Sequence, residues 1–162
     1  MRQSILDTAL RLSMRRCGCS NFHHFCVLFR GKKVIATGFN CFCRNLKHLG
    51  AVFSVHAELN ALQKVKDKRR SFDMLVIRTN NSKTSLLNSK PCLRCEMWIK
   101  NYPVNKIYFS NEQGGISYIN STQLPISFKH NDHHRSVECK DVCCIKVNLA
   151  TISSPSLVQE AF

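Results

Sequence analysis

Two short motifs, well separated along the chain, constrain this sequence more than any other feature. The first is His56-Ala57-Glu58, and the second, Pro91-Cys92-Leu93-Arg94-Cys95, begins 33 positions after the first ends. His56, Cys92 and Cys95 offer one imidazole and two thiolates, a borderline-soft ligand set that suits Zn²⁺. A chain that uses all three on one ion must fold so that two distant segments meet.

Glu58 supplies the group that would turn such a metal centre into a catalyst. Zinc held by three protein ligands keeps a fourth position open for water and lowers the pKa of that water from ~15.7 toward ~7. Glu58 stands two residues from His56, so on a helix the two side chains diverge by about 200° and the carboxylate is free to move protons.

The order H-x-E…P-C-x-x-C is the signature of zinc-dependent base deaminases. In such enzymes the acid passes a proton from water to a ring nitrogen and then to the departing amine. A lone C-x-x-C is often a structural zinc site, and a lone H-x-E is often a solvated helix end. Both motifs together, in this order, favour one catalytic zinc ion.

Length and composition indicate one globular domain. The chain has 162 residues, 44% of them hydrophobic, which suffices for a single buried core. Its apolar runs are too short to span a bilayer, so no membrane partner is expected. Ten cysteines without a secretory signal indicate a reducing intracellular compartment, cytoplasm or nucleus. The arginine-rich start would also suit mitochondrial targeting, but it fits a first core helix better.

Positive charge is concentrated in the part of the chain that holds the motifs. The formal net charge is +14; residues 1–120 carry 20 Lys or Arg and 6 Asp or Glu, whereas residues 121–162 carry four of each. This favours an anionic partner, either a nucleotide phosphate or a nucleic-acid backbone. Ordinary surface solubility would explain any single lysine equally well.

The pattern of apolar residues predicts an α/β domain in which helices flank a sheet. Ile5, Ala9 and Leu12 repeat at helical spacing near the start. The expected elements are a helix over 4–15, a hairpin over 25–29 and 34–38, a loop over 41–54, a helix over 55–68, a buried strand over 72–78, a polar loop over 79–90, a helix from Pro91 to about 101, and strands over 106–110 and 116–119 joined at Gly114-Gly115. We expect residues 1–120 to form the catalytic domain and residues 121–162 an extension, partly ordered or a mobile tail.

Polar residues at strand and loop ends are candidate substrate contacts. Asn40 ends the second strand, so its amide could meet a sugar hydroxyl, although asparagine is equally at home in a turn. Arg44, Lys47 and His48 in the following loop are candidates for phosphate contact. The basic run over 64–70 lies at the far end of its helix from the first motif. We interpret it mainly as surface, with nucleic-acid binding as the alternative.

Two further groups of cysteine and histidine raise the question of a second metal site. They are Cys17, Cys19, His23, His24 and Cys26, and then His130, His133, His134, Cys139, Cys143 and Cys144. The first group has no established zinc spacing, and Cys26 falls in a strand where a thiol behaves as a small apolar group. The second overlaps a strand-like alternation over 143–149, so non-metal roles are favoured for both.

With these residues laid out, the chain resembles the cytidine/deoxycytidylate deaminase superfamily over about residues 2–120. The resemblance implies a three-layer α/β/α fold, in which a five-stranded mixed sheet has helices on both faces and the two motif helices present the zinc. It implies that His56, Cys92 and Cys95 hold one zinc ion and that Glu58 is the proton shuttle. Family members often form homo-oligomers, so self-association is expected by analogy.

The resemblance also implies substrate contacts, and the sequence differs from some family branches at particular positions. Asn40 is similar to the sugar-contacting asparagine of deoxycytidylate and tRNA adenosine deaminases, and the backbone of Ala57, Ser89 and Pro91 would bracket the base. Free cytidine deaminases usually have Cys in the position of His56, and Glu in that of Phe42. The Gly114-Gly115 hairpin, however, resembles the antiparallel end of those same enzymes, so the sequence mixes features of both branches.

Three functions are compatible with these residues. The preferred one is zinc-dependent hydrolytic deamination of a cytosine nucleotide of the CMP/dCMP type to the uracil form and ammonia. The second is the same chemistry on RNA or single-stranded DNA, at cytosine or adenine. The third is an inactive, zinc-stabilised nucleic-acid-binding module. The intact Glu58 speaks against the third, because a purely structural site has no use for that acid.

Overall fold

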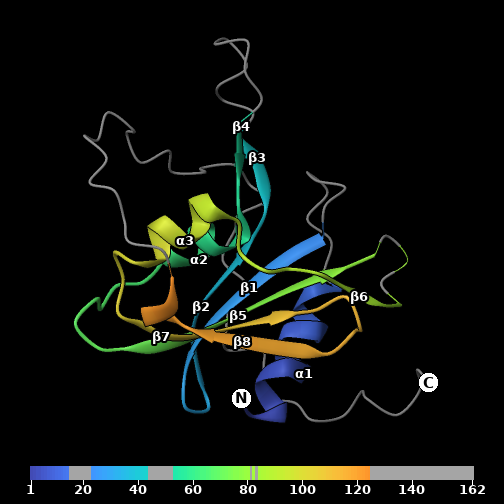
Figure 1. Cartoon of the computed structure of the whole chain (residues 1–162), viewed down its shortest axis with the longest axis horizontal. Helices are drawn as coiled ribbons and strands as arrows, with labels where there is room; N and C mark the ends of the chain where they lie inside the picture. Colours follow the sequence, from blue (N-terminus) through green and yellow to red (C-terminus); the bar gives the residue numbers. More distant parts are fainter. Residues whose placement is uncertain (15–22, 44–52, 81, 83, 125–162) are drawn as a thin grey trace.

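The computed structural model describes residues 1–14, 23–43, 53–80, 82 and 84–124, which form a mixed sheet with helices on both faces (Figure 1). The elements are α1 (Gln3–Ser13), β1 (His23–Arg30), β2 (Lys33–Phe39), β3 (Cys41–Cys43), β4 (Phe53–Val55), α2 (Ala57–Leu62), β5 (Phe72–Thr79), β6 (Leu86–Leu87), α3 (Leu93–Ile99), β7 (Val104–Ser110), β8 (Ile116–Asn120) and the 3₁₀ turn η2 (Ser121–Gln123). The strand order β2-β1-β5-β7-β8 contains the five expected strands, and the short β6 adds a sixth beside β5. The predicted three-layer α/β/α fold is confirmed.

The sheet places several strand ends at one edge. β5 is parallel to β7 and antiparallel to β1, and β1 is antiparallel to β2. The ends of β2, β5 and β7 and the start of β1 therefore share one edge, which we call the carboxyl edge. The expected β7–β8 hairpin is also present, with Gly114 at φ +77° in its turn.

Each face of the sheet is covered by a different set of helices (Figure 1). The apolar stripe of α1, formed by Ile5, Ala9 and Leu12, packs on one face in a buried cluster with alternate residues of β1 and β5. On the other face α2 and α3 pack in a second buried cluster that includes Cys95 and Ile99. β1 and β5 are buried on both faces because they lie in the middle of the sheet.

Gly38 lets α2 lie directly on β2. A Cβ built at Gly38 would be 2.2 Å from the carbonyl oxygen of Ala57 and 2.5 Å from the backbone nitrogen of Ala61. Only glycine, which has no Cβ, fits between β2 and the backbone of α2 at this separation. This one position therefore fixes how closely the first motif helix approaches the sheet.

Two predicted loops contain short strands. Within the expected loop over 41–54, β3 and β4 pair antiparallel as a separate two-stranded sheet. Within the expected loop over 79–90, β6 pairs with the end of β5. Pairing of two or three residues leaves almost no period in a sequence, so neither pair of short strands could be predicted.

The helix expected over 55–68 is shorter than predicted, because α2 ends at Leu62. The backbone N–H groups of Lys64 and Val65 bond to carbonyls three residues earlier, and the Lys64 ammonium donates to the Thr37 carbonyl at 2.8 Å. Further helix would stack lysines and arginines at i, i+4 spacing, which is unfavourable. None of the described helices is long and apolar enough to cross a membrane.

Candidate metal and catalytic centre

The two motifs meet at the carboxyl edge because each stands at the start of a helix. His56 is the N-cap of α2 and Cys92 is the N-cap of α3, both with extended backbone. Cys95 follows three residues later, one helical turn on, so its sulfur lies on the same side as that of Cys92. Pro91 precedes the cap and is not in the first turn as predicted; it still cannot extend the helix backwards.

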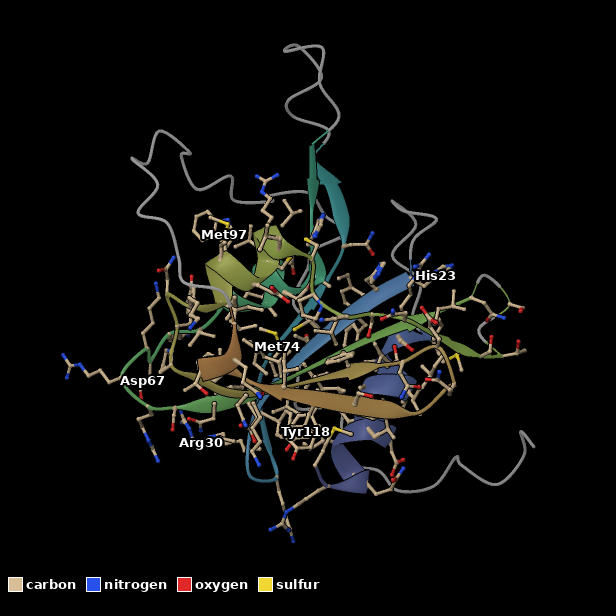
Figure 2. The ribbon with its side chains drawn as sticks, viewed as in Figure 1. His23, Arg30, Asp67, Met74, Met97 and Tyr118 are labelled. Carbon is tan, nitrogen blue, oxygen red and sulfur yellow. The ribbon has the colours of Figure 1, made fainter. Side chains whose placement is uncertain are left out.

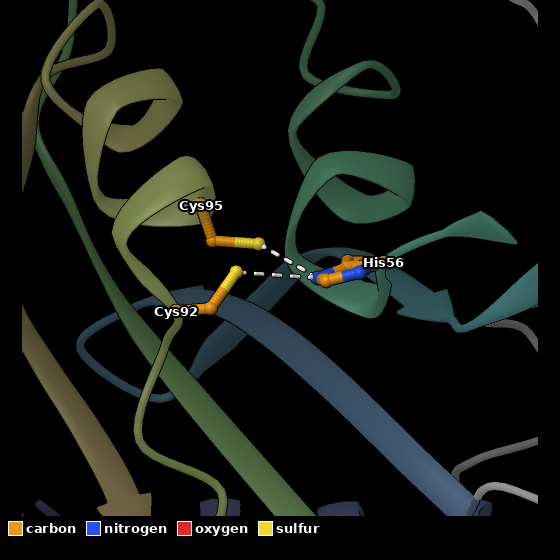
Figure 3. A group of neighbouring side chains, drawn as sticks. All are labelled: His56, Cys92 and Cys95. Carbon is orange, nitrogen blue, oxygen red and sulfur yellow. Dashed lines mark hydrogen bonds between the residues drawn. The ribbon is translucent and has the colours of Figure 1, made fainter.

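The three side chains converge on one point (Figure 3). His56 Nδ1 lies 3.2 Å from Cys95 Sγ and 3.6 Å from Cys92 Sγ, and all three ligand atoms lie within 4.8 Å of one another. Tetrahedral zinc with Zn–S of about 2.3 Å and Zn–N of about 2.0 Å requires N···S separations of about 3.6 Å. The donor set therefore fits a zinc ion, with Nδ1 as the imidazole ligand.

Glu58 lies beside this cluster and is almost fully buried, with 5% of its surface exposed. Burial raises the pKa of Glu58, partly offset by its own backbone N–H, by His56 and by a hydrogen bond with Cys95. Burial, and then the Glu58 charge, also raise the pKa of the Cys95 thiol. A carboxylate and a thiolate that are buried side by side repel each other. A divalent cation relieves this repulsion, and a thiol that coordinates the metal is deprotonated.

Asn40 and Ala57 lie next to the cluster in the fold. Asn40 is buried; its Oδ1 accepts a hydrogen bond from the His24 N–H at 3.2 Å, and its own N–H donates to the His24 carbonyl at 3.3 Å. Ala57 is fully buried at the start of α2, and its carbonyl faces Gly38. Both residues are firmly positioned, and their roles in substrate binding stay predictions.

Ser89 is held by side-chain hydrogen bonds that the sequence did not indicate. Its hydroxyl donates to the Val76 carbonyl at 2.8 Å and accepts from the Ser110 N–H at 2.9 Å. The hydroxyl groups of Ser89 and Ser110 also bond to each other at 2.8 Å. The segment from Ser89 to the buried Pro91 is thus anchored to β5 and β7, so only its backbone remains for the predicted contact with the base.

Other predicted residues lie partly or wholly outside the described segments. Arg44, Lys47 and His48 lie outside them, as do Cys17, Cys19 and the whole group from His130 to Cys144. Cys26 is fully buried in β1, and burial raises its pKa, as expected for an apolar role. Among the described residues, the cluster of His56, Cys92 and Cys95 is the one arrangement suited to a metal.

Arg78 and His24 lie at the same edge of the sheet as this site, and sequence reasoning gave neither a role there. They are cross-strand partners at the carboxyl edge, on β5 and β1. Burial lowers the pKa of His24 to about 4, with further contributions from Arg78 and then from His56. The available signal was an arginine near the end of a largely apolar strand.

Comparisons with known proteins give a match to one family model and two similar solved structures. The family model described as "Cytidine and deoxycytidylate deaminase zinc-binding region" matches residues 1–111. Two solved structures of the dCMP deaminase from the cyanophage S-TIM5 are similar to the chain. The apo form has 21% identity and a TM-score of 0.46, covering 69% of this chain and 86% of that one. The complex with dCMP and dUMP has 20% identity and a TM-score of 0.48, covering 69% and 85%. No curated protein matches the chain.

Proposed function

Since the chain belongs to the cytidine and deoxycytidylate deaminase family of zinc-dependent hydrolases, we propose that it deaminates a free cytosine nucleotide, CMP or dCMP, to the uracil form and ammonia. The observation that carries this proposal is the buried Glu58 in hydrogen-bond contact with Cys95, one member of the His/Cys/Cys cluster. An acid in that place has a use in catalysis and none in a structural zinc site. The net charge of +14 favours a phosphorylated substrate over a nucleoside.

The residues divide the reaction between them. A zinc ion held by His56, Cys92 and Cys95 supplies Lewis-acid activation of water. Glu58 takes a proton from the attacking water and delivers it to the ring nitrogen next to C4. Once the water oxygen has bonded to C4, Glu58 takes the second proton from that new hydroxyl and passes it to the departing amine as the C4–N bond breaks, so one water is consumed and one ammonia is released. Burial raises the pKa of Glu58 above its ordinary value, the direction that suits an acid that both takes and gives a proton.

Ammonia release across a substrate panel tests the proposal. The zinc-loaded protein is incubated with dCMP, CMP, deoxycytidine, cytidine, adenosine nucleotides and a cytosine-containing oligonucleotide. We expect the highest kcat/KM on dCMP or CMP, at least about 10-fold above the matching nucleoside, which corresponds to one charge-assisted hydrogen bond of about 1.5 kcal/mol. Turnover confined to oligonucleotides or to adenine, or no turnover with zinc bound, would reject it.

A second candidate, deamination within a polynucleotide, is favoured by one observation. Arg30, Arg69 and Arg70 line a shallow depression of about 470 Å³, at the end of β1 opposite His23 (Figure 2). That end lies about 23 Å from the carboxyl edge along the eight-residue β5, so a nucleic-acid strand could contact both. Binding to an oligonucleotide that weakens steeply with salt, together with base conversion in it, would favour this candidate.

A further inference from the structure

Arg78 and His24 lie side by side on the face of the sheet that carries the metal ligands. They are direct partners in the β1–β5 register, at the carboxyl edge. Side chains alternate between faces along a strand. Val76 and Cys26, two residues away from Arg78 and His24 on their own strands, belong to the buried cluster with α2 and α3. Arg78 and His24 therefore face the same side as that cluster, above which His56 and Cys95 meet.

The Arg78 guanidinium is partly buried and has no protein partner within the described part of the chain. Outside the strand ladders, Arg78 donates a hydrogen bond from its backbone N–H to Ser110 Oγ at 3.2 Å. His24 is the direct cross-strand partner of Arg78, so the two side chains lie side by side at this edge.

Asn40 fixes where a nucleotide would lie relative to Arg78. Asn40 at the end of β2 is hydrogen-bonded to His24 on β1, and His24 is paired with Arg78 on β5. Neighbouring strands are about 4.8 Å apart, so Asn40 and Arg78 are about 10 Å apart along the edge. A sugar near Asn40 and a 5′-phosphate near the long Arg78 side chain fit this separation.

We propose that Arg78, with His24 beside it, binds the 5′-phosphate of the substrate and so makes the enzyme select nucleotides over nucleosides. This inference rests on the proposed function and names the residue behind its specificity. A guanidinium presents two parallel N–H donors to phosphate oxygens, a charge-assisted contact that lysine reproduces only in part. Such hydrogen bonds contribute about 1.5–3 kcal/mol, equivalent to about 10- to 150-fold in affinity.

The test compares Arg78→Gln and Arg78→Lys with wild type on dCMP and on deoxycytidine. We expect kcat/KM for dCMP to fall about 10- to 100-fold in Arg78→Gln and less in Arg78→Lys. Deoxycytidine has no phosphate, so its kcat/KM should change by less than about 3-fold. Inorganic phosphate should compete with deoxycytidine in wild type and much less in Arg78→Gln. Arg11→Gln, which removes one exposed arginine from α1 on the opposite face, is the matched control.

Each outcome decides the matter. Equal losses of kcat/KM on dCMP and deoxycytidine would mean that Arg78 only supports the fold. Unchanged kcat/KM on dCMP would mean that Arg78 does not contact the phosphate. Either result overturns the inference and leaves the proposed function standing. If wild type itself shows no preference for dCMP over deoxycytidine, the phosphate contact is rejected before any variant is measured. If wild type deaminates neither, the proposed function fails with it.

Discussion

Substitution of Gly38 by alanine tests whether the packing of α2 on β2 sets the geometry of the catalytic centre. The new Cβ would lie 2.2 Å from the Ala57 carbonyl oxygen, whereas ordinary contact begins at 3.4 Å, so α2 and β2 must separate locally by about 1.2 Å. Both obstructing atoms belong to helix backbone and cannot rotate away. Over-packing of this kind costs about 1–3 kcal/mol. For a chain of this length that lowers the melting temperature by roughly 2–12 °C.

The same displacement moves His56 and Glu58 relative to the two cysteines of α3. A misplacement of about 1 Å costs on the order of 100-fold in rate, so kcat of Gly38→Ala should fall by about that factor while the protein stays folded. Thermal unfolding, zinc content and kcat are measured together. Gly115→Ala is the matched control, because its Cβ would meet its nearest atoms at 3.5 Å. If Gly38→Ala keeps the stability, zinc and kcat of wild type, the close approach does not position the site.

Three further predictions concern the metal, the proton shuttle and pH. Glu58→Gln should keep its zinc and melting temperature while kcat falls about 10²- to 10⁴-fold; loss of zinc instead would make Glu58 a ligand. Cys95→Ala should lose stoichiometric zinc and activity, whereas Cys26→Ala, which alters another buried thiol, should still bind one zinc per chain on elemental analysis. Because the pKa of His24 is lowered to about 4 from an ordinary 6.5, the folded state binds fewer protons than the unfolded state between these values. Stability to urea should therefore fall by at most about 3 kcal/mol as pH drops from 6.5 to 4, and His24→Gln should flatten that fall; an unchanged slope would contradict it.

The elements that sequence predicted best are those with a strong period. The stripe of Ile5, Ala9 and Leu12 gave α1, the continuous apolar run over 72–78 gave the central strand, and the glycine pair at 114–115 gave the last hairpin. The metal cluster was also predictable, because His56, Cys92 and Cys95 are chemically distinctive whatever surrounds them.

The features that could not be predicted from the sequence depend on tertiary contacts. Lys64, two residues after the end of α2, donates to the Thr37 carbonyl, a contact between residues far apart in the chain. The role of Ser89 as an anchor depends on Ser110, and the place of Arg78 depends on strand register. Serines and one arginine carry no signal of such partners until the sheet is assembled.

The most direct test of the central claim is X-ray absorption at the zinc edge, on wild type and on Cys95→Ala. Wild type should show one zinc per chain with two sulfur ligands at about 2.3 Å and lighter ligands at about 2.0 Å, and Cys95→Ala should bind little zinc, any that remains having a single sulfur ligand. A wild-type sulfur count other than two, or a spectrum that the substitution leaves unchanged, would show that these side chains do not meet at one zinc ion.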